Sequence, residues 1–104
     1  MSEYIVIFVT VGKEEEAQNI AHTLISENLI ACVNMVKDIR SLYKWQGNIC
    51  DDKEILLIMK SKKELLNKII YRVKSLHSYD TPEIIAVPIV GGYQEYLKWI
   101  DNEI

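Results

Sequence analysis

Hydrophobic positions along the chain follow two periods, about two and about 3.6 residues, which are those of strands and helices. Residues 3–11 form a β-branched and apolar run on both faces, as expected of a strand that is covered on both sides. In residues 13–28, apolar residues recur at helical spacing after three glutamates, whose negative charge favours the positive end of a helix dipole. The first predicted unit is therefore a strand followed by a helix.

A long hairpin is predicted in the middle of the chain. Residues 29–45 are apolar in their first half and alternate between apolar and polar in their second half, and residues 49–60 return as another apolar run. Between them, Gln46-Gly47-Asn48 is typical of a hairpin turn. Because a two-stranded ribbon is unstable alone, we expect this long one to reach beyond its own domain and to pack on another surface.

The rest of the chain predicts a helix, a strand and a final helix. Ser61 and Glu64 have the spacing of a capping box, in which each side chain bonds a backbone amide at the start of a helix. The apolar positions that follow recur at helical spacing as far as His77. A fourth strand is expected over residues 83–90, where Pro88 favours an edge position or a bulge. Two glycines then lead into a short last helix.

The element order β-α-β-β-α-β, followed by a helix, predicts an α+β fold of the ferredoxin-like type. In this split βαβ arrangement two helices cover one face of a four-stranded antiparallel sheet, and we expect residues 1–104 to form a single domain. The first and third predicted strands are apolar on the other face as well, and soluble monomers seldom expose that much contiguous apolar surface. We therefore expect the open face of the sheet to be buried against another subunit.

Composition, charge and one missing motif argue against nucleic acid as a partner. The chain is 49% hydrophobic and 26% charged, as in ordinary soluble proteins, and its net charge of -3 disfavours a general binder of nucleic-acid phosphates. The third predicted strand also lacks the aromatic signature of the RNA-recognition domains that share this element order. We therefore expect no nucleic-acid partner.

The sequence shows no membrane or secretion segment. Its apolar stretches fall well short of the roughly 20 residues that a spanning helix needs, and no basic or cleavable leader is visible. Cys32 and Cys50 form no CxxC pair and are expected to be reduced thiols. These features predict a cytoplasmic protein with no membrane partner. Catalytic motifs such as GxSxG, the P-loop and HExxH are absent, so we expect no enzyme.

Side chains that could bind a metal ion are scattered, and none has a strong ligand spacing. His77 is a candidate ligand for Cu²⁺ or Zn²⁺, or else a cap whose imidazolium answers the dipole at the end of a helix. Cys32 is a candidate thiolate ligand, or else a small hydrophobe in an apolar strand. Glu83 could reach the same pocket as His77, or else bond the neighbouring loop backbone. Further candidate donors are His22, Cys50, Asp80 and the acidic run Asp51, Asp52 and Glu54, although such runs are usually solvated.

Several runs of residues resemble a known family. They are Ile30-Ala31-Cys32-Val33-Asn34 and residues 39–47, 77–85 and 96–100. The most specific, in combination, are the Ser41-x-Tyr43-x-Trp45-x-Gly47 run and the His77-x-Tyr79-x-x-Pro82-Glu83 run. In this order, and almost from end to end, the chain resembles the divalent-cation tolerance proteins called CutA.

The resemblance implies a ferredoxin-like fold assembled into a stable homotrimer, a link to tolerance of copper and other divalent metals, and no established catalytic activity. It also implies an architecture similar to that of the PII signalling proteins. Some family members have a cysteine late in the first strand and a second histidine beside the loop histidine, and this chain has Val9 and Leu76 there. Ser78 and Asp80 stand where the family usually has proline and often has glutamate.

One hypothesis that follows is a trimeric, non-enzymatic protein that binds or responds to divalent metal ions, without an obligate cofactor. Cu²⁺ is its first candidate ion, partly because copper tops the affinity order for nitrogen and oxygen donors. Cys32, His77 and Glu83 would be the metal ligands.

The alternative is a PII-like signalling or scaffold trimer that binds a small ligand or a protein partner at the seam between subunits. Its aromatic residues would line a pocket there, or else fill the core and the trimer contacts; they are Tyr43, Trp45, Tyr79, Tyr96 and Trp99. With polar groups such as Arg40, Lys60 and Glu54, that pocket would suit a small anionic ligand, by analogy of fold alone.

Overall fold

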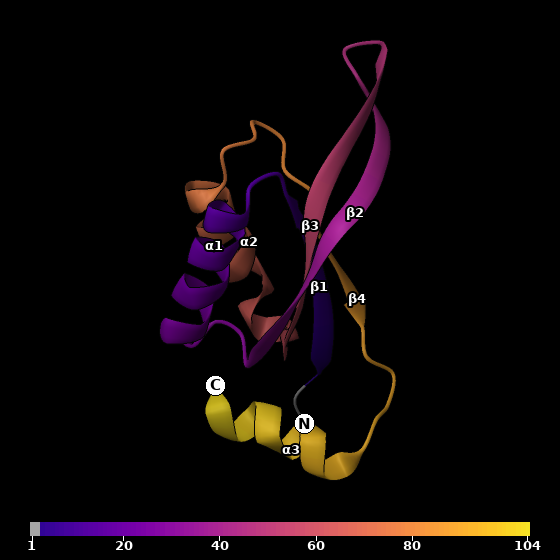
Figure 1. Cartoon of the computed structure of the whole chain (residues 1–104). Helices are drawn as coiled ribbons and strands as arrows, with labels where there is room; N and C mark the ends of the chain where they lie inside the picture. The colour runs from indigo at the N-terminus through magenta and orange to yellow at the C-terminus, as the bar shows by residue number, and fades with distance from the viewer. Residues whose placement is uncertain (1–2) are drawn as a thin grey trace.

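The computed structural model describes residues 3–104, which form one antiparallel sheet with helices packed against it (Figure 1). In chain order the elements are β1 (Tyr4–Val11), α1 (Glu14–Ser26), β2 (Cys32–Trp45), β3 (Asn48–Lys62), the short 3-10 helix η1 (Lys63–Leu65), α2 (Leu66–Leu76), β4 (Ile84–Pro88) and α3 (Gln94–Glu103). The strands lie in the order β2-β3-β1-β4, and every neighbouring pair is antiparallel. The predicted ferredoxin-like α+β fold is confirmed.

The hydrophobic core lies between the sheet and helices α1 and α2, which cover one face of it (Figure 1). Buried and partly exposed residues alternate along β1, because successive side chains of a strand point to opposite faces. The buried set packs against the apolar stripes of the two helices. Fully buried members of this core include Ile7, Val9, Val11, Ile20, Leu24, Ile30, Leu57, Met59, Ile69 and Val73.

The opposite face of the sheet carries apolar side chains that remain exposed. Strand register places Phe8 between Ile58 on β3 and Ile85 on β4, all on this face. Ile85 is 53% exposed and its neighbour on the same face, Val87, 42%. Helix α3 lies toward one end of the sheet in Figure 1. The prediction of an apolar open face is confirmed, and its burial against another subunit stays a prediction.

Strands β2 and β3 extend beyond the rest of the molecule as a twisted ribbon (Figure 1). A register shift between Val36 and Ile39 marks a bulge, in which Asp38 has a φ of 59°. At the tip, Gln46 and Gly47 have φ values of 51° and 81°. Two positive φ values in a row fit a type I′ turn, whose twist matches that of the strands. The predicted long hairpin and its turn are confirmed.

The predicted capping box at Ser61 is wrong. Ser61 lies inside β3, opposite Ile5 of β1, and is fully buried. Its hydroxyl donates a hydrogen bond to the carbonyl oxygen of Leu29 at 2.6 Å. Glu64 lies within η1, and neither η1 nor α2 has a side-chain cap. A buried hydroxyl needs a partner, and the nearby loop carbonyl supplies it in place of the amide of the following turn.

Several strand boundaries also differ from the prediction, most clearly those of β2 and β4. β2 begins at Cys32 rather than near residue 29, because Asn28 adopts a φ of 59° and the amide of Leu29 donates to the carbonyl of Leu24 at 3.0 Å. These features extend the end of α1 into the chain before β2. β4 spans 84–88 rather than 83–90 and lies at the sheet edge, which is the position that its proline predicted.

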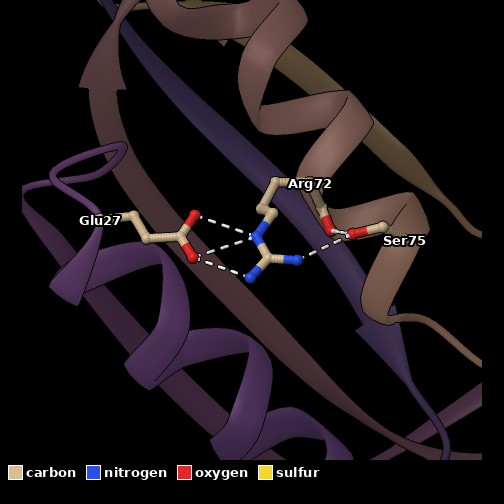
Figure 2. Close-up of polar contacts among 3 residues, drawn as sticks. All are labelled: Glu27, Arg72 and Ser75. Atoms are coloured by element: carbon tan, nitrogen blue, oxygen red, sulfur yellow. Dashed lines mark hydrogen bonds and ion pairs between the residues drawn. The ribbon is translucent and has the colours of Figure 1, made fainter.

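An ion pair joins the two helices that cover the sheet. Figure 2 shows the guanidinium of Arg72 on α2 facing the carboxylate of Glu27 at the end of α1, with Nη2 to Oε2 at 2.8 Å and Nε to Oε1 at 2.9 Å. Ser75 accepts from Arg72 Nη1 at 3.2 Å and donates to the Arg72 carbonyl at 2.6 Å. The guanidinium lowers the pKa of Glu27 below its usual value.

Candidate functional site

A groove of about 820 Å³ lies between the β2–β3 hairpin and the loop that joins α2 to β4. Residues 40–45 and 79–83 line it, together with Thr10 and Glu54. Most of the two runs that carry the CutA resemblance therefore border the same cavity, although residues 48–76 separate them in the sequence. The sheet brings them together because β3 pairs with both β1 and β2, and the loop crosses near the end of β1.

Tyr79 fixes this loop to the sheet. It lies so close to Gly12 that a Cβ atom at residue 12 would be 2.7 Å from the Tyr79 hydroxyl, which explains the glycine. The hydroxyl donates to Oε2 of Glu54 at 2.9 Å, and Glu54 is only 6% exposed. The expectation of a solvated acidic run holds for Asp51 and Asp52, which are exposed, but is wrong for Glu54, which is buried and bonded to Tyr79.

A second tyrosine of the groove is also paired with a carboxylate. Tyr43 donates to Oδ2 of Asp52 at 2.5 Å, and this hydrogen bond raises the pKa of Tyr43 to about 12. Burial, followed by the hydrogen bond to Glu54, raises the pKa of Tyr79 well above its usual value. Both phenols therefore stay protonated at neutral pH and act as hydrogen-bond donors.

The basic side chain Arg40 is already matched by an acid. Its Nε lies 2.9 Å from Oδ1 of Asp51 and its Nη2 lies 2.5 Å from Oδ2, a two-pronged ion pair. The hydrogen bonds raise the pKa of Arg40 and lower that of Asp51. Among the groove residues this leaves Lys44 as the other basic side chain. The groove is therefore not a basic pocket.

His77 ends α2 and is buried, with none of its side chain exposed. Its Nε2 lies 2.8 Å from the carbonyl oxygen of Thr10, and its Nδ1 accepts a hydrogen bond from the amide of Tyr79 at 3.1 Å. A carbonyl oxygen accepts a hydrogen bond and an amide N–H donates one, so the ring carries its proton on Nε2 and accepts at Nδ1. The position at the helix end is as predicted, but the ring ties the loop to β1 and leaves no lone pair for a metal.

Cys32 lies elsewhere, at the start of β2 on the open face of the sheet. Its Sγ is 3.9 Å from the ammonium of Lys60, which faces it across the strands, and the burial of Tyr96 and its hydrogen bond to Cys32 raise the pKa of that tyrosine. Cys32 is half-buried and not a core hydrophobe. Register separates Lys60, opposite Val6, from Thr10 by four residues of β1, about 13 Å. Cys32 and His77 therefore do not meet within one chain.

Of the three proposed metal ligands only Glu83 lines the groove, where it is exposed near the start of β4; the further candidate donors Glu54 and Asp80 line it as well. His77 is not part of the groove lining, so it does not share a pocket with Glu83. Within residues 3–104, no group of three or more histidine, cysteine, aspartate and glutamate side chains could hold a metal ion. The donors of a single chain therefore do not fit a metal site.

The aromatic residues divide between two places. Tyr43, Trp45 and Tyr79 line the groove, whereas Tyr96 and Trp99 pack together on α3 with ring centroids 5.5 Å apart. All of them except Tyr79 are exposed by 40% or more, so the interpretation that they fill the core of the subunit is wrong. Their place in trimer contacts stays a prediction.

Two residues of the site were missed from the sequence. Thr10 contributes to the groove and its carbonyl holds His77, and Gly12 makes room for Tyr79. A threonine near the end of an apolar strand, followed closely by a glycine, was the available signal. It was weak, because both residue types are also common where a strand simply ends.

Comparison with known proteins places the chain in a family. Residues 5–103 match the family described as CutA1 divalent ion tolerance protein. The "Divalent-cation tolerance protein CutA" of Thermus thermophilus is 46% identical over 95 residues, which cover 91% of this chain and 92% of the relative. The crystal structure of CutA1 from Oryza sativa has a TM-score of 0.94 and 46% identity, and the match covers 97% of this chain and 93% of that one.

Other relatives are longer than this chain. "Protein CutA, chloroplastic" of Arabidopsis thaliana is 44% identical over 98 residues, which cover 94% of this chain but 54% of the relative. The chain thus spans about half the length of that protein. The match to the family nevertheless runs through nearly all of this chain, and the solved rice structure has the same fold. The chain therefore belongs to the CutA1 divalent ion tolerance protein family.

Proposed function

We propose that the chain serves tolerance of divalent cations as a homotrimer and without catalysing a reaction. The observation that carries the proposal is that most of the two runs that carry the family resemblance border one groove in this fold. The relatives named for divalent-cation tolerance give the functional class.

Assembly into trimers is supported by the apolar open face and the projecting hairpin. Leu42 and Ile49 on the hairpin are 64% and 76% exposed, in addition to the apolar residues exposed on the sheet. Surfaces of this kind mark protein–protein contacts. Light scattering tests the assembly: a particle of three times the 12.1 kDa chain mass is expected, and a particle of one chain mass at micromolar concentration would contradict it.

Cu²⁺ is the first ion to test, and Cys32, His77 and Glu83 remain its proposed ligands. Because these residues do not meet within one chain, a site would have to join donors of different subunits and would have to release His77 from its hydrogen bonds. Tolerance without direct coordination is the competing outcome.

Calorimetric titration of chelator-stripped protein with Cu²⁺, in the presence of a weak competing chelator, decides between these outcomes. One saturable site per subunit with a dissociation constant well below micromolar supports a real site. Cys32→Ser, His77→Ala and Glu83→Gln should then weaken it, while His22→Ala, at an exposed histidine of α1, should not. Weak uptake beyond one ion per subunit would contradict direct metal binding, because exposed histidines and carboxylates take up Cu²⁺ unspecifically.

A cytoplasmic location is proposed for this chain on the basis of its two free thiols, which are typical of reducing compartments. The Arabidopsis relative is named chloroplastic, so members of the family differ in location. None of the helices within residues 3–104 is long and apolar enough to cross a membrane. Fractionation of cells that express the chain with a C-terminal tag is the test.

A second candidate function is a signalling or scaffold trimer that binds a small ligand or a protein partner. The groove favours it, since a cavity of about 820 Å³ with aromatic and polar lining is of the size that small ligands occupy. Ligand-induced stabilisation in the presence of EDTA would separate this function from metal binding. A broad panel of ligands that leaves the melting temperature unchanged would argue against it.

A further inference from the structure

The groove has an excess of negative charge. Its carboxylates are Glu54, Asp80 and Glu83, and its basic side chains are Arg40 and Lys44. Arg40 is engaged by Asp51, which lies outside the groove lining, so its charge is matched from elsewhere. Within residues 3–104, the groove therefore holds three carboxylates and one unpaired ammonium group, that of Lys44.

Glu54 is the buried carboxylate of the groove. Glu54 is 6% exposed, and its carboxylate accepts a hydrogen bond from the neutral hydroxyl of Tyr79. No ion pair among residues 3–104 includes Glu54. A buried carboxylate without a cation loses hydration that a neutral donor replaces only in part. A cationic group in the groove would supply the missing charge.

The aromatic lining suits a cation too. Trp45 and Tyr43 remain 44% and 40% exposed, and both line the groove with Tyr79. The faces of such rings attract ammonium groups, most strongly where the site excludes water. Rings and carboxylates in one cavity therefore favour the same kind of ligand.

The geometry favours an organic cation over a bare metal ion. Metal coordination needs several donors around one point, and the described residues provide no such group. The carboxylates instead come from different places: Glu54 is on β3, whereas Asp80 and Glu83 are on the loop. A chain with separated ammonium groups can reach both places. Each ammonium donates hydrogen bonds, for which carboxylate and hydroxyl oxygens are acceptors.

We propose that this groove binds a small aliphatic amine that carries two or more primary ammonium groups, a diamine or a polyamine. The proposal deepens the second candidate function, on which it rests, by naming the class of ligand. It reverses the expectation of a small anionic ligand. That expectation counted Arg40 as a free charge and placed Lys60 at the same pocket, whereas Arg40 is paired and Lys60 lies beside Cys32.

The test is a calorimetric titration of the full chain with spermidine and with putrescine, at physiological salt and with EDTA present. Saturable binding is expected, and Glu54→Gln should weaken it about tenfold or more, since salt screens a buried charge much less than exposed ones. Glutamine keeps the shape of the side chain and an oxygen that accepts from Tyr79. Glu95→Gln is the matched control, because it removes the same charge from an exposed position on α3, away from the groove. It should leave binding unchanged.

Three results would overturn the proposal. The first is no saturable binding at millimolar amine. The second is equal weakening by Glu54→Gln and Glu95→Gln, which would indicate attraction to net charge alone. The third is thermal stabilisation by small anions but not by amines, which would reject the amine class while leaving the second candidate function in place. A melting temperature of Glu54→Gln close to that of the parent chain, measured without ligand, confirms that the comparison is between folded proteins.

Discussion

The two faces of the central sheet differ in how much of their apolar surface a single chain buries. On the helix side, Ile7, Val9 and Leu57 are fully buried under α1 and α2. On the other side, Ile85 and Val87 remain about half exposed although their neighbours in the sheet are also apolar. The same strands thus contribute side chains to a buried core on one face and to an exposed apolar surface on the other. One face stabilises the fold of the subunit, and the other is available for assembly.

Ile85→Lys tests the open face and should change the particle most. A lysine at this half-exposed edge-strand position should alter the stability of the isolated subunit by no more than about 0.5 kcal/mol. Within a trimer it would bury a charge, so the scattering mass should fall from three chains to one. Tyr71→Lys, at a 77% exposed site on α2, is the control that should stay trimeric. An unchanged mass for both variants would remove the open face from the interface.

Leu57→Ala tests the helix-covered face. Leu57 is fully buried and lies opposite Val9 in the sheet, so its truncation leaves a cavity under the helices. The expected loss in the free energy of unfolding is about 2–5 kcal/mol. Urea denaturation, followed by circular dichroism in a background that is already monomeric, gives this value. A loss as small as that of an exposed side chain would show that the two faces do not differ.

Ser61→Ala tests the polar contact that took the place of the predicted cap. The variant leaves the carbonyl of Leu29 without its donor, and the expected loss is about 1–3 kcal/mol. The same denaturation experiment measures it. Glu64→Ala should cost less, because Glu64 is exposed and makes no cap. If Glu64→Ala lost more stability than Ser61→Ala, that result would support the predicted capping box instead.

Arg72→Ala should have the smallest effect, since its ion pair with Glu27 is on the surface of the helix layer. The pKa of Glu27 is lowered in the folded chain, so the stability from this pair is present above the ordinary value of 4.5 and is lost as pH falls through the folded pKa. The parent should therefore lose more stability than the variant between neutral pH and acid. Urea midpoints at the two pH values check this, with Lys68→Ala as control, because Lys68 is exposed on α2 and is in no ion pair among residues 3–104. Equal acid losses in parent and variant would contradict the pairing.

The elements themselves were readable from the chain because their signals are local. Strand alternation, helical stripes and the glycine of the hairpin turn depend on neighbours within a few residues. The positions of Ser61 and Glu54 were misread for the opposite reason. Their partners, Leu29 and Tyr79, lie 32 and 25 residues away and are reached only in the folded sheet.

The candidate site was predicted in part. The two runs with Tyr43 and Tyr79 were singled out, and they do meet at one groove. The predicted metal ligands do not come together, because the type of a residue does not determine the face of the sheet on which its side chain lies. Register sets Cys32 on the open face, and the end of α2 sets His77 under the loop with both ring nitrogens engaged.

The order of the amino acids alone specified the α+β fold, the long hairpin, the apolar second face and the family. These depend on periodicity and on motifs, which are properties of neighbouring residues. Folding in three dimensions settled which carboxylate is buried, which arginine is already paired and which donors fail to meet. Those outcomes depend on strand register and on contacts between distant segments, and a change of one residue in register would place each side chain on the other face.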